Sequence, residues 1–87
     1  MLQVTRNASA LLARYLEEAE TTRNSAIRFI LDREQFSLEV DTPHPGDAQF
    51  RFGGRVVLVL DRRISDSLAN NTLDVKQTTG GPALELV

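Results

Sequence analysis

FRFGGRVVLVLDRRISDSLANN, the stretch from Phe50 to Asn71, guides the interpretation of the rest of this chain. Its dipeptide Gly53-Gly54 is typical of a tight hairpin turn, because such a turn needs positive φ at both central positions. Residues 49–52 alternate polar and apolar side chains before the turn, and Arg55–Leu60 is a nearly continuous apolar run after it. We therefore predict a β-hairpin whose second strand is covered on both faces.

A short helix is expected directly after this hairpin. Asp61 is a good N-cap residue, because its carboxylate can accept a hydrogen bond from a free backbone N–H of the first helical turn. The helix runs through Ile64 and Leu68 and is expected to end at Asn70-Asn71, since asparagine tolerates the left-handed conformation found at helix ends.

A longer helix is predicted near the N-terminus, with Thr5 as its N-cap. Apolar residues then recur at spacings of three and four, which places them on one face of a helix of about four turns. These residues are Ala8, Leu11, Leu12, Tyr15, Leu16 and Ala19. Arg14 and Glu18 are four residues apart and are expected to pair on the exposed face. The pattern ends at Thr21–Ser25.

Strands account for most of the remaining sequence. We predict strands at Ala26–Leu31 and at Phe36–Val40, the second with Phe36, Leu38 and Val40 on its buried face, and two further strands at Thr72–Gln77 and Ala83–Val87. The connecting segments contain proline, glycine or several polar residues and are predicted as a turn at Asp32–Glu34 and loops at Thr42–Asp47 and Thr78–Pro82. The predicted fold is a single α+β, mainly β domain over residues 1–87, with the N-terminal amphipathic helix packed on a curled mixed sheet or sandwich.

Composition limits the classes of function. The 87 residues carry a net charge of −2 and contain no cysteine. An acidic balance argues against a nucleic-acid-binding protein. The short apolar runs and the absence of a signal-peptide pattern predict no membrane span and a cytoplasmic protein. Nine of the ten basic residues are arginine, which fits either recognition of carboxylate or phosphate groups or a compositional bias of the genome.

Four segments in order resemble the HesB-like family of A-type iron–sulfur carriers. They are VTRNASALLARYLEEA at 4–19, DTPHPGD at 41–47, the hairpin and helix of 50–71, and TLDV at 72–75 followed by TTGGPALELV at 78–87. The resemblance covers nearly the whole chain and implies the HesB-like fold, which opens with a short strand before the helix. It also implies self-association, so a homo-oligomer is expected.

The departures from this family concern its chemistry. Members carry one cysteine between the first two long strands and a Cys-Gly-Cys pair near the C-terminus. Here the first region is LDREQFSL, residues 31–38, and the sequence ends at Val87 without the pair. Because iron and iron–sulfur clusters need thiolate ligands, no cofactor is assigned to any residue. We expect a non-catalytic domain that serves as a protein-interaction or accessory scaffold with an unidentified protein partner, connected to iron–sulfur cluster assembly or to another process.

An alternative hypothesis is metal or small-ligand binding at the proline-rich loop. His44 is the only histidine and lies between Asp41 and Asp47, a combination of ligands that some divalent metals accept. Transition-metal sites usually have more imidazoles or thiolates, and Pro43 and Pro45 restrict the loop. A solvated loop histidine is therefore the favoured interpretation.

The short helix offers a second candidate surface. Arg62, Arg63 and Asp66 form a charged group beside Asp61, which suits either a partner-recognition surface or a helix cap with exposed charges. Ser65 and Ser67 have no nearby activating base in the sequence, so we predict no catalytic residue and no enzymatic activity. The four phenylalanines, Phe29, Phe36, Phe50 and Phe52, fall at inward strand positions and are expected in the core rather than on a stacking platform.

Overall fold

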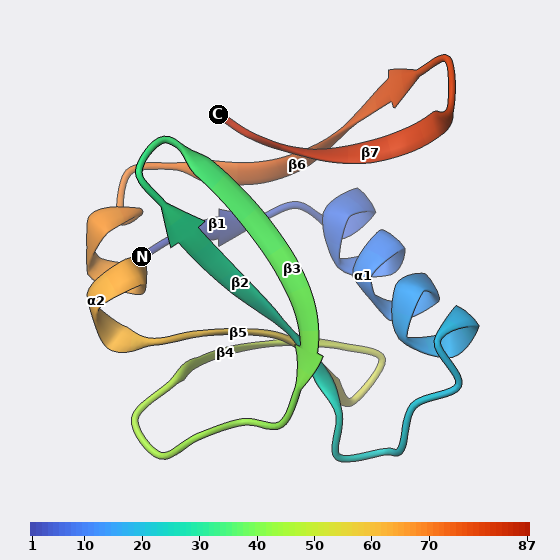
Figure 1. Ribbon diagram of the computed structural model, residues 1–87, viewed down its shortest axis with the longest axis horizontal. Helices are drawn as coiled ribbons and strands as arrows, with labels where there is room; N and C mark the ends of the chain where they lie inside the picture. Colours follow the sequence, from blue (N-terminus) through green and yellow to red (C-terminus); the bar gives the residue numbers. More distant parts are fainter.

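The computed structural model describes residues 1–87 and contains two helices and seven strands (Figure 1). In chain order they are β1 (Gln3–Val4), α1 (Arg6–Glu18), β2 (Ala26–Asp32), β3 (Gln35–Asp41), β4 (Ala48–Phe52), β5 (Arg55–Leu60), α2 (Arg62–Ser67), β6 (Thr72–Thr78) and β7 (Gly81–Leu86). The predicted α+β, mainly β fold with an N-terminal helix packed on mixed sheets is therefore confirmed.

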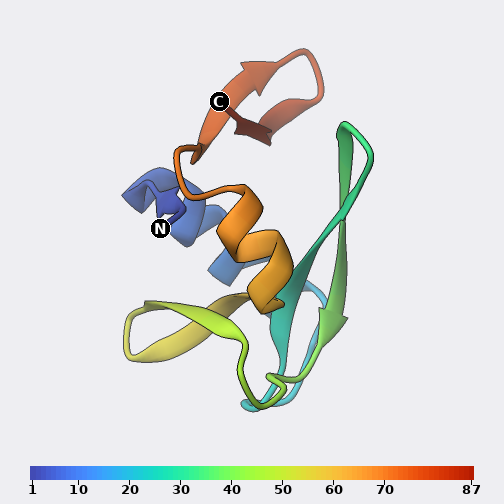
Figure 2. The same cartoon turned by 90° about the vertical axis from the view of Figure 1, so that its left-hand side faces the viewer.

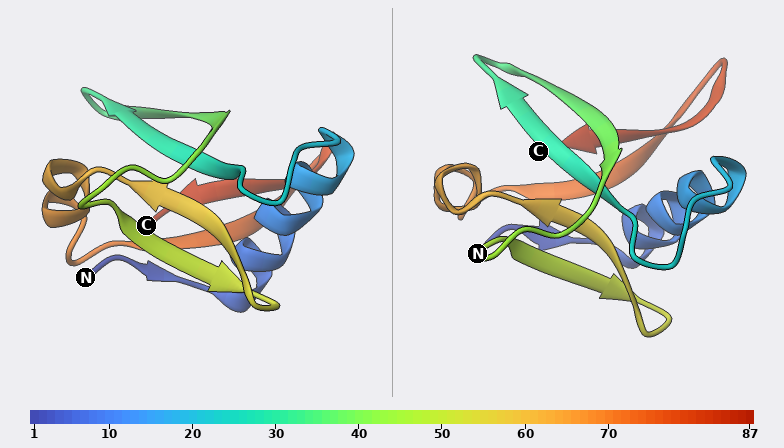
Figure 3. Two further views of the ribbon diagram at one scale, coloured as in Figure 1. Left: turned by 90° about the horizontal axis from the view of Figure 1, so that it is seen from below. Right: turned by 60° about the horizontal axis from the view of Figure 1, so that its bottom comes forward.

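The strands form two sheets. One sheet has the order β1-β6-β7, with β1 parallel to β6, and the other has the order β3-β2-β5-β4, with β2 parallel to β5. Helix α1 contacts strands of both sheets. Figures 2 and 3 show the β6–β7 hairpin and the β4–β5 hairpin on different sides of this helix. The helix thus joins the two sheets around a common core.

The core is a single cluster of thirteen buried hydrophobic residues. The apolar face of α1 contributes Leu11, Leu12 and Leu16 to this core. Strand β5 contributes Val57, Leu58 and Leu60. All of Val57–Leu60 is inaccessible to solvent, which confirms that this strand is covered on both faces. Phe29 is buried and stacks on Phe36, with 4.8 Å between ring centroids. No helix is long and apolar enough to cross a membrane.

Both helices start at the predicted caps. The Thr5 hydroxyl accepts a hydrogen bond from the Ala8 N–H and donates one to Asp74 on β6 at 2.8 Å. The Asp61 carboxylate accepts a hydrogen bond from the Ile64 N–H at 2.9 Å. Thr5 therefore connects the start of α1 to the β1-β6-β7 sheet, in addition to satisfying a helix donor.

Several details differ from the sequence prediction. Helix α2 ends at Ser67 rather than at Asn70-Asn71. Strand β1 was not predicted from the residue pattern, because two residues show no periodicity. The predicted loop at Thr78–Pro82 is a tight turn, so β7 begins at Gly81. Val40 is 48% exposed rather than buried. It lies on β3, an edge strand, opposite Ile27 of β2, and does not belong to the core cluster.

Candidate functional site

The proline-rich loop is fixed by one arginine from the middle of β2. Arg28 donates from Nε to Asp41 at 2.7 Å, and from both Nη atoms to Asp47, with the shorter contact at 2.6 Å. Its side chain is 11% exposed and that of Asp47 is 4% exposed. Arg28 also donates to the Thr42 carbonyl at 3.3 Å. A buried arginine thus ties both ends of the loop to the sheet.

These contacts change the acid–base properties of the loop. The Arg28 guanidinium holds the pKa values of the Asp41 and Asp47 carboxyls below their usual range, and a backbone N–H, of Thr42 or of His44, lowers each of them further. Asp47 raises the pKa of Arg28 in return. Arg28, Asp41 and Asp47, the triad of the loop, therefore stay fully ionised at neutral pH.

His44 lies beside this triad, but the arrangement argues against the alternative metal site. Its Nε2 is 3.4 Å from Asp41, while Asp47 accepts a hydrogen bond from the His44 backbone N–H. Arg28 already occupies oxygen atoms of both carboxylates, so these atoms have a cationic partner without a metal ion. No group of three or more histidine, cysteine or acidic side chains is arranged to hold a metal ion.

The second predicted site, on α2, is an exposed charged surface. Arg62, Arg63 and Asp66 are exposed, whereas Ser65 and Leu68 face the interior. Arg62 and Asp66 also line a hollow of about 350 Å³ between the helix and Gly46–Ala48. These exposed charges therefore adjoin the end of the proline-rich loop.

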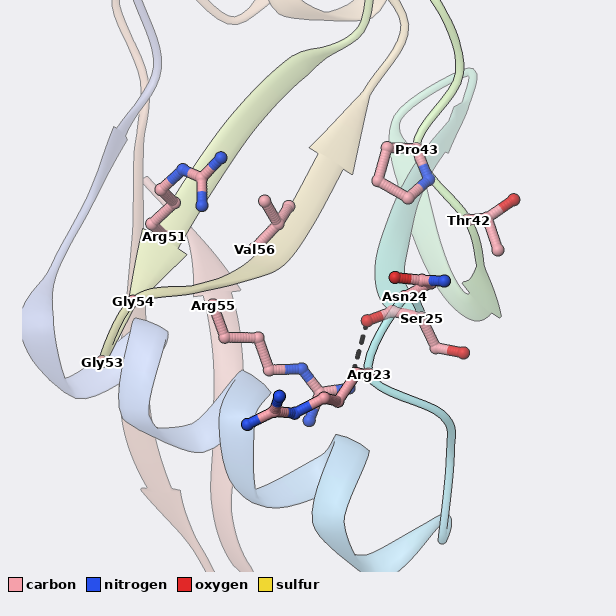
Figure 4. Close-up of a pocket in the computed structure, with 10 residues that line it drawn as sticks. All are labelled: Arg23, Asn24, Ser25, Thr42, Pro43, Arg51, Gly53, Gly54, Arg55 and Val56. Atoms are coloured by element: carbon pink, nitrogen blue, oxygen red, sulfur yellow. Dashed lines mark hydrogen bonds between the residues drawn. The ribbon is translucent and has the colours of Figure 1, made fainter.

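A larger groove lies at the opposite end of β5. It has a volume of about 930 Å³ and lies among the α1–β2 connection, the start of the proline-rich loop and the β4–β5 turn (Figure 4). Strands β2 and β5 pair only at Ile27–Leu58 and Arg28–Val59. The groove lies where the two strands diverge, on the N-terminal side of these paired residues.

Arginine dominates the groove lining. Arg23, Arg51 and Arg55 line it together with uncharged residues, and no acidic residue is among them. None of the three forms an ion pair. In a protein with net charge −2, this is a local concentration of uncompensated positive charge.

Arg55 has a structural role that the other two arginines lack. Its Nη2 donates to the Ser25 carbonyl at 3.1 Å, to the Thr22 carbonyl at 3.0 Å and to the Thr21 hydroxyl at 3.3 Å. Its Nε is buried without a hydrogen-bond partner. Arg23 and Arg51 are exposed and make no side-chain hydrogen bond within the chain. Arg55 therefore holds the α1–β2 connection against the hairpin, and Arg23 and Arg51 are available for other contacts.

Sequence reasoning missed Arg28 and the three groove arginines. A signal for Arg28 was available, because a lone arginine within the apolar strand AIRFILD requires a buried acceptor. The groove arginines come from segments up to about thirty residues apart, and only the folded chain brings them together.

Residues 31–38, where the sequence resemblance expects the family's first cysteine, lie in the β2–β3 hairpin. Asp32 pairs with Gln35, which leaves the two-residue turn Arg33-Glu34, and Arg33 has a positive φ of 60°. The chain has no thiol at this turn or elsewhere. The hairpin is complete without ligands, because Phe29 and Phe36 stack across it.

Comparison with solved structures identifies the fold of this protein. No family profile matches the sequence, and no curated protein matches it. The structure, however, is similar to solved structures of A-type iron–sulfur carriers, and the HesB-like fold is therefore shown.

Two solved structures illustrate this similarity. Escherichia coli SufA, described as involved in biosynthesis of iron–sulfur clusters, superimposes with a TM-score of 0.72 at 15% identity, over 99% of this chain and 83% of SufA. IscA, solved with a [2Fe-2S] cluster, superimposes with a TM-score of 0.61 at 15% identity, over all of this chain and 81% of IscA. At such identity the likeness establishes the fold alone.

Proposed function

We propose that this protein is a non-catalytic accessory scaffold of iron–sulfur cluster assembly, which acts through contacts with other proteins and holds no cluster of its own. One observation carries the proposal: 99% of the chain adopts the fold of SufA, yet the chain contains no cysteine. Clusters and soft iron require thiolates or a comparable ligand set. The chain thus has this fold but lacks the cysteines that would bind an iron–sulfur cluster.

The core supports a scaffold role, because its stability does not depend on a bound metal. The thirteen core residues come mainly from α1 and both sheets, with Leu68 at the C-cap of α2, and none of them is a potential metal ligand. The exposed surface on α2 supplies a place for contact, since Arg62 and Arg63 can be replaced without disturbing the buried face of the helix. Arginine is also favoured at protein interfaces.

The first test measures what the protein carries and what it binds. Tagged protein isolated under anaerobic conditions is expected to contain far less than stoichiometric iron and acid-labile sulfide, and to enrich proteins of cluster assembly. Stoichiometric iron and sulfide would refute the loss of cluster binding. A preparation in which no assembly protein is enriched over a tag-only control would refute the connection to assembly.

A pair of variants tests the contact surface. Arg62→Glu with Arg63→Glu is expected to reduce the recovery of the partner, because it reverses two exposed charges on α2. Arg6→Glu with Arg33→Glu makes the same change in net charge at exposed positions outside α2. Equal recovery with both double variants would show that α2 is not the contact surface.

A further inference from the structure

We propose that the groove lined by Arg23, Arg51 and Arg55 binds an extended acidic segment of a partner protein. This deepens the proposed function, on which it rests for the nature of the partner. The groove contains three arginines without ion pairs and no acidic residue. Such a surface attracts carboxylates, which guanidinium groups bind in a paired geometry.

The placement of the arginines favours an extended ligand over a single small anion. Figure 4 shows Arg51 to the left of Val56, and the side chains of Arg23 and Arg55 lower in the view. The three arginines come from the α1–β2 connection and from both strands of the β4–β5 hairpin, so cations line the groove on more than one side, which suits several carboxylates better than one anion. The volume of about 930 Å³ is also at the upper end of the range for ligand sites.

The remaining lining residues narrow the chemistry further. Val56 is the only aliphatic side chain apart from the ring of Pro43, and no aromatic residue lines the groove. A nucleotide base or a nucleic-acid strand would therefore find no stacking partner, and an amphipathic helix would find no apolar floor. Asn24, Ser25 and Thr42 instead offer polar groups for the backbone of an extended peptide.

The groove is held open by contacts that do not use its free arginines. Arg55 ties the α1–β2 connection to the hairpin, and Arg28 ties Thr42 to the sheet through its carbonyl. The walls are thus set before a ligand arrives, which lowers the entropic cost of binding. Arg23 and Arg51 remain exposed for contact.

The test is a titration of the isotope-labelled protein, followed by NMR, with a peptide of alternating glutamate and serine. We expect shifts concentrated at the backbone amides of Ser25, Gly53, Gly54 and Val56, which weaken as salt is added. Arg23→Gln with Arg51→Gln is expected to weaken binding about tenfold, because two exposed ion pairs are lost. Arg6→Gln with Arg33→Gln removes the same charge at exposed positions outside both the groove and α2, and is expected to change the affinity less than about twofold.

Three outcomes would overturn the inference. They are an equal loss of affinity in both double variants, no shift at the groove amides, and shifts of these amides with inorganic phosphate or pyrophosphate but not with the peptide. Thr42→Glu, which places a carboxylate in the groove, is a second variant expected to weaken binding if the arginine double variant does not fold. The titration needs no native partner, so its failure is separate from a failure to enrich assembly proteins.

Discussion

Replacing Asp47 with asparagine tests the strongest polar contact in the structure. Asp47 accepts three hydrogen bonds: two from Arg28, the shorter at 2.6 Å, and one from the His44 N–H at 2.7 Å. The substitution keeps the size of the side chain but removes its charge. It also places an NH₂ group opposite a donor, so that one of these contacts is lost.

The expected cost follows from the nature of these bonds. A hydrogen bond to a charged group contributes about 1.5–3 kcal/mol and a neutral one about 1 kcal/mol. Arg28 retains its contact with the 29%-exposed Asp41, and water can reach that side of the triad. We therefore expect Asp47→Asn to lower the free energy of unfolding by about 2 kcal/mol at pH 7. For a domain of this size, that is a large part of the total.

Urea unfolding followed by circular dichroism measures this change. The pKa of Asp47 is lowered in the folded protein by Arg28, so as the pH falls below about 5 the unfolded chain takes up the proton first. The stability that Asp47 contributes is present above the pKa of the unfolded chain, near 3.9, and is lost as the pH falls through the lower folded value.

The difference between the wild type and Asp47→Asn should therefore shrink from pH 7 toward about pH 3. Glu18→Gln is the control, because the Arg14–Glu18 pair is about two-thirds exposed on both sides and should contribute less than about 0.5 kcal/mol. A loss for Asp47→Asn no larger than that of Glu18→Gln, or a loss that is constant with pH, would refute the role assigned to the triad.

Three further changes test the fold. Gly54→Ala should destabilise the protein by about 1–2 kcal/mol in urea unfolding, because Gly54 has φ +78°, whereas Gly80→Ala, at a position without positive φ, should be tolerated. Val57→Ala should lower the free energy of unfolding by about 2 kcal/mol in the same assay, since Val57 is fully buried. Val40→Ala should lower it by less than about 0.5 kcal/mol, since Val40 is 48% exposed. Thr5→Ala should lower the thermal midpoint by removing about 1 kcal/mol of capping, whereas Thr5→Ser retains the hydroxyl and most of the stability.

The sequence predicted most of the fold, because local signals and the final structure agree. The periodicity of α1, the apolar run of β5 and the turn at Gly53-Gly54 each follow from chemistry within a few residues. Val40 was placed wrongly, since alternation along a strand shows which residues share a face but not how far a neighbouring element covers that face. The parallel pairing of β2 with β5 depends on segments about thirty residues apart and has no local signal.

The site was predicted less well for a related reason. The proline-rich loop was identified, but its carboxylates were considered beside His44, the nearest candidate in sequence. Arg28, which lies 13 residues from Asp41 and 19 from Asp47, is their actual partner. The short spacing of loop residues suggested a metal site, and only the folded chain shows that Arg28 contacts both carboxylates.

Strand β5 separates the two surfaces proposed for partner contact. The groove begins at Arg55 and the α2 surface begins at Arg62, at opposite ends of a strand whose last four residues are inaccessible to solvent. A six-residue strand spans about 20 Å, and its burial makes the distance between the two ends difficult to change. Substitutions of exposed arginines at one end should therefore leave the other end in place. A partner that loses affinity on changes at either end must span this distance, whereas a partner sensitive to one end only identifies the surface that it uses.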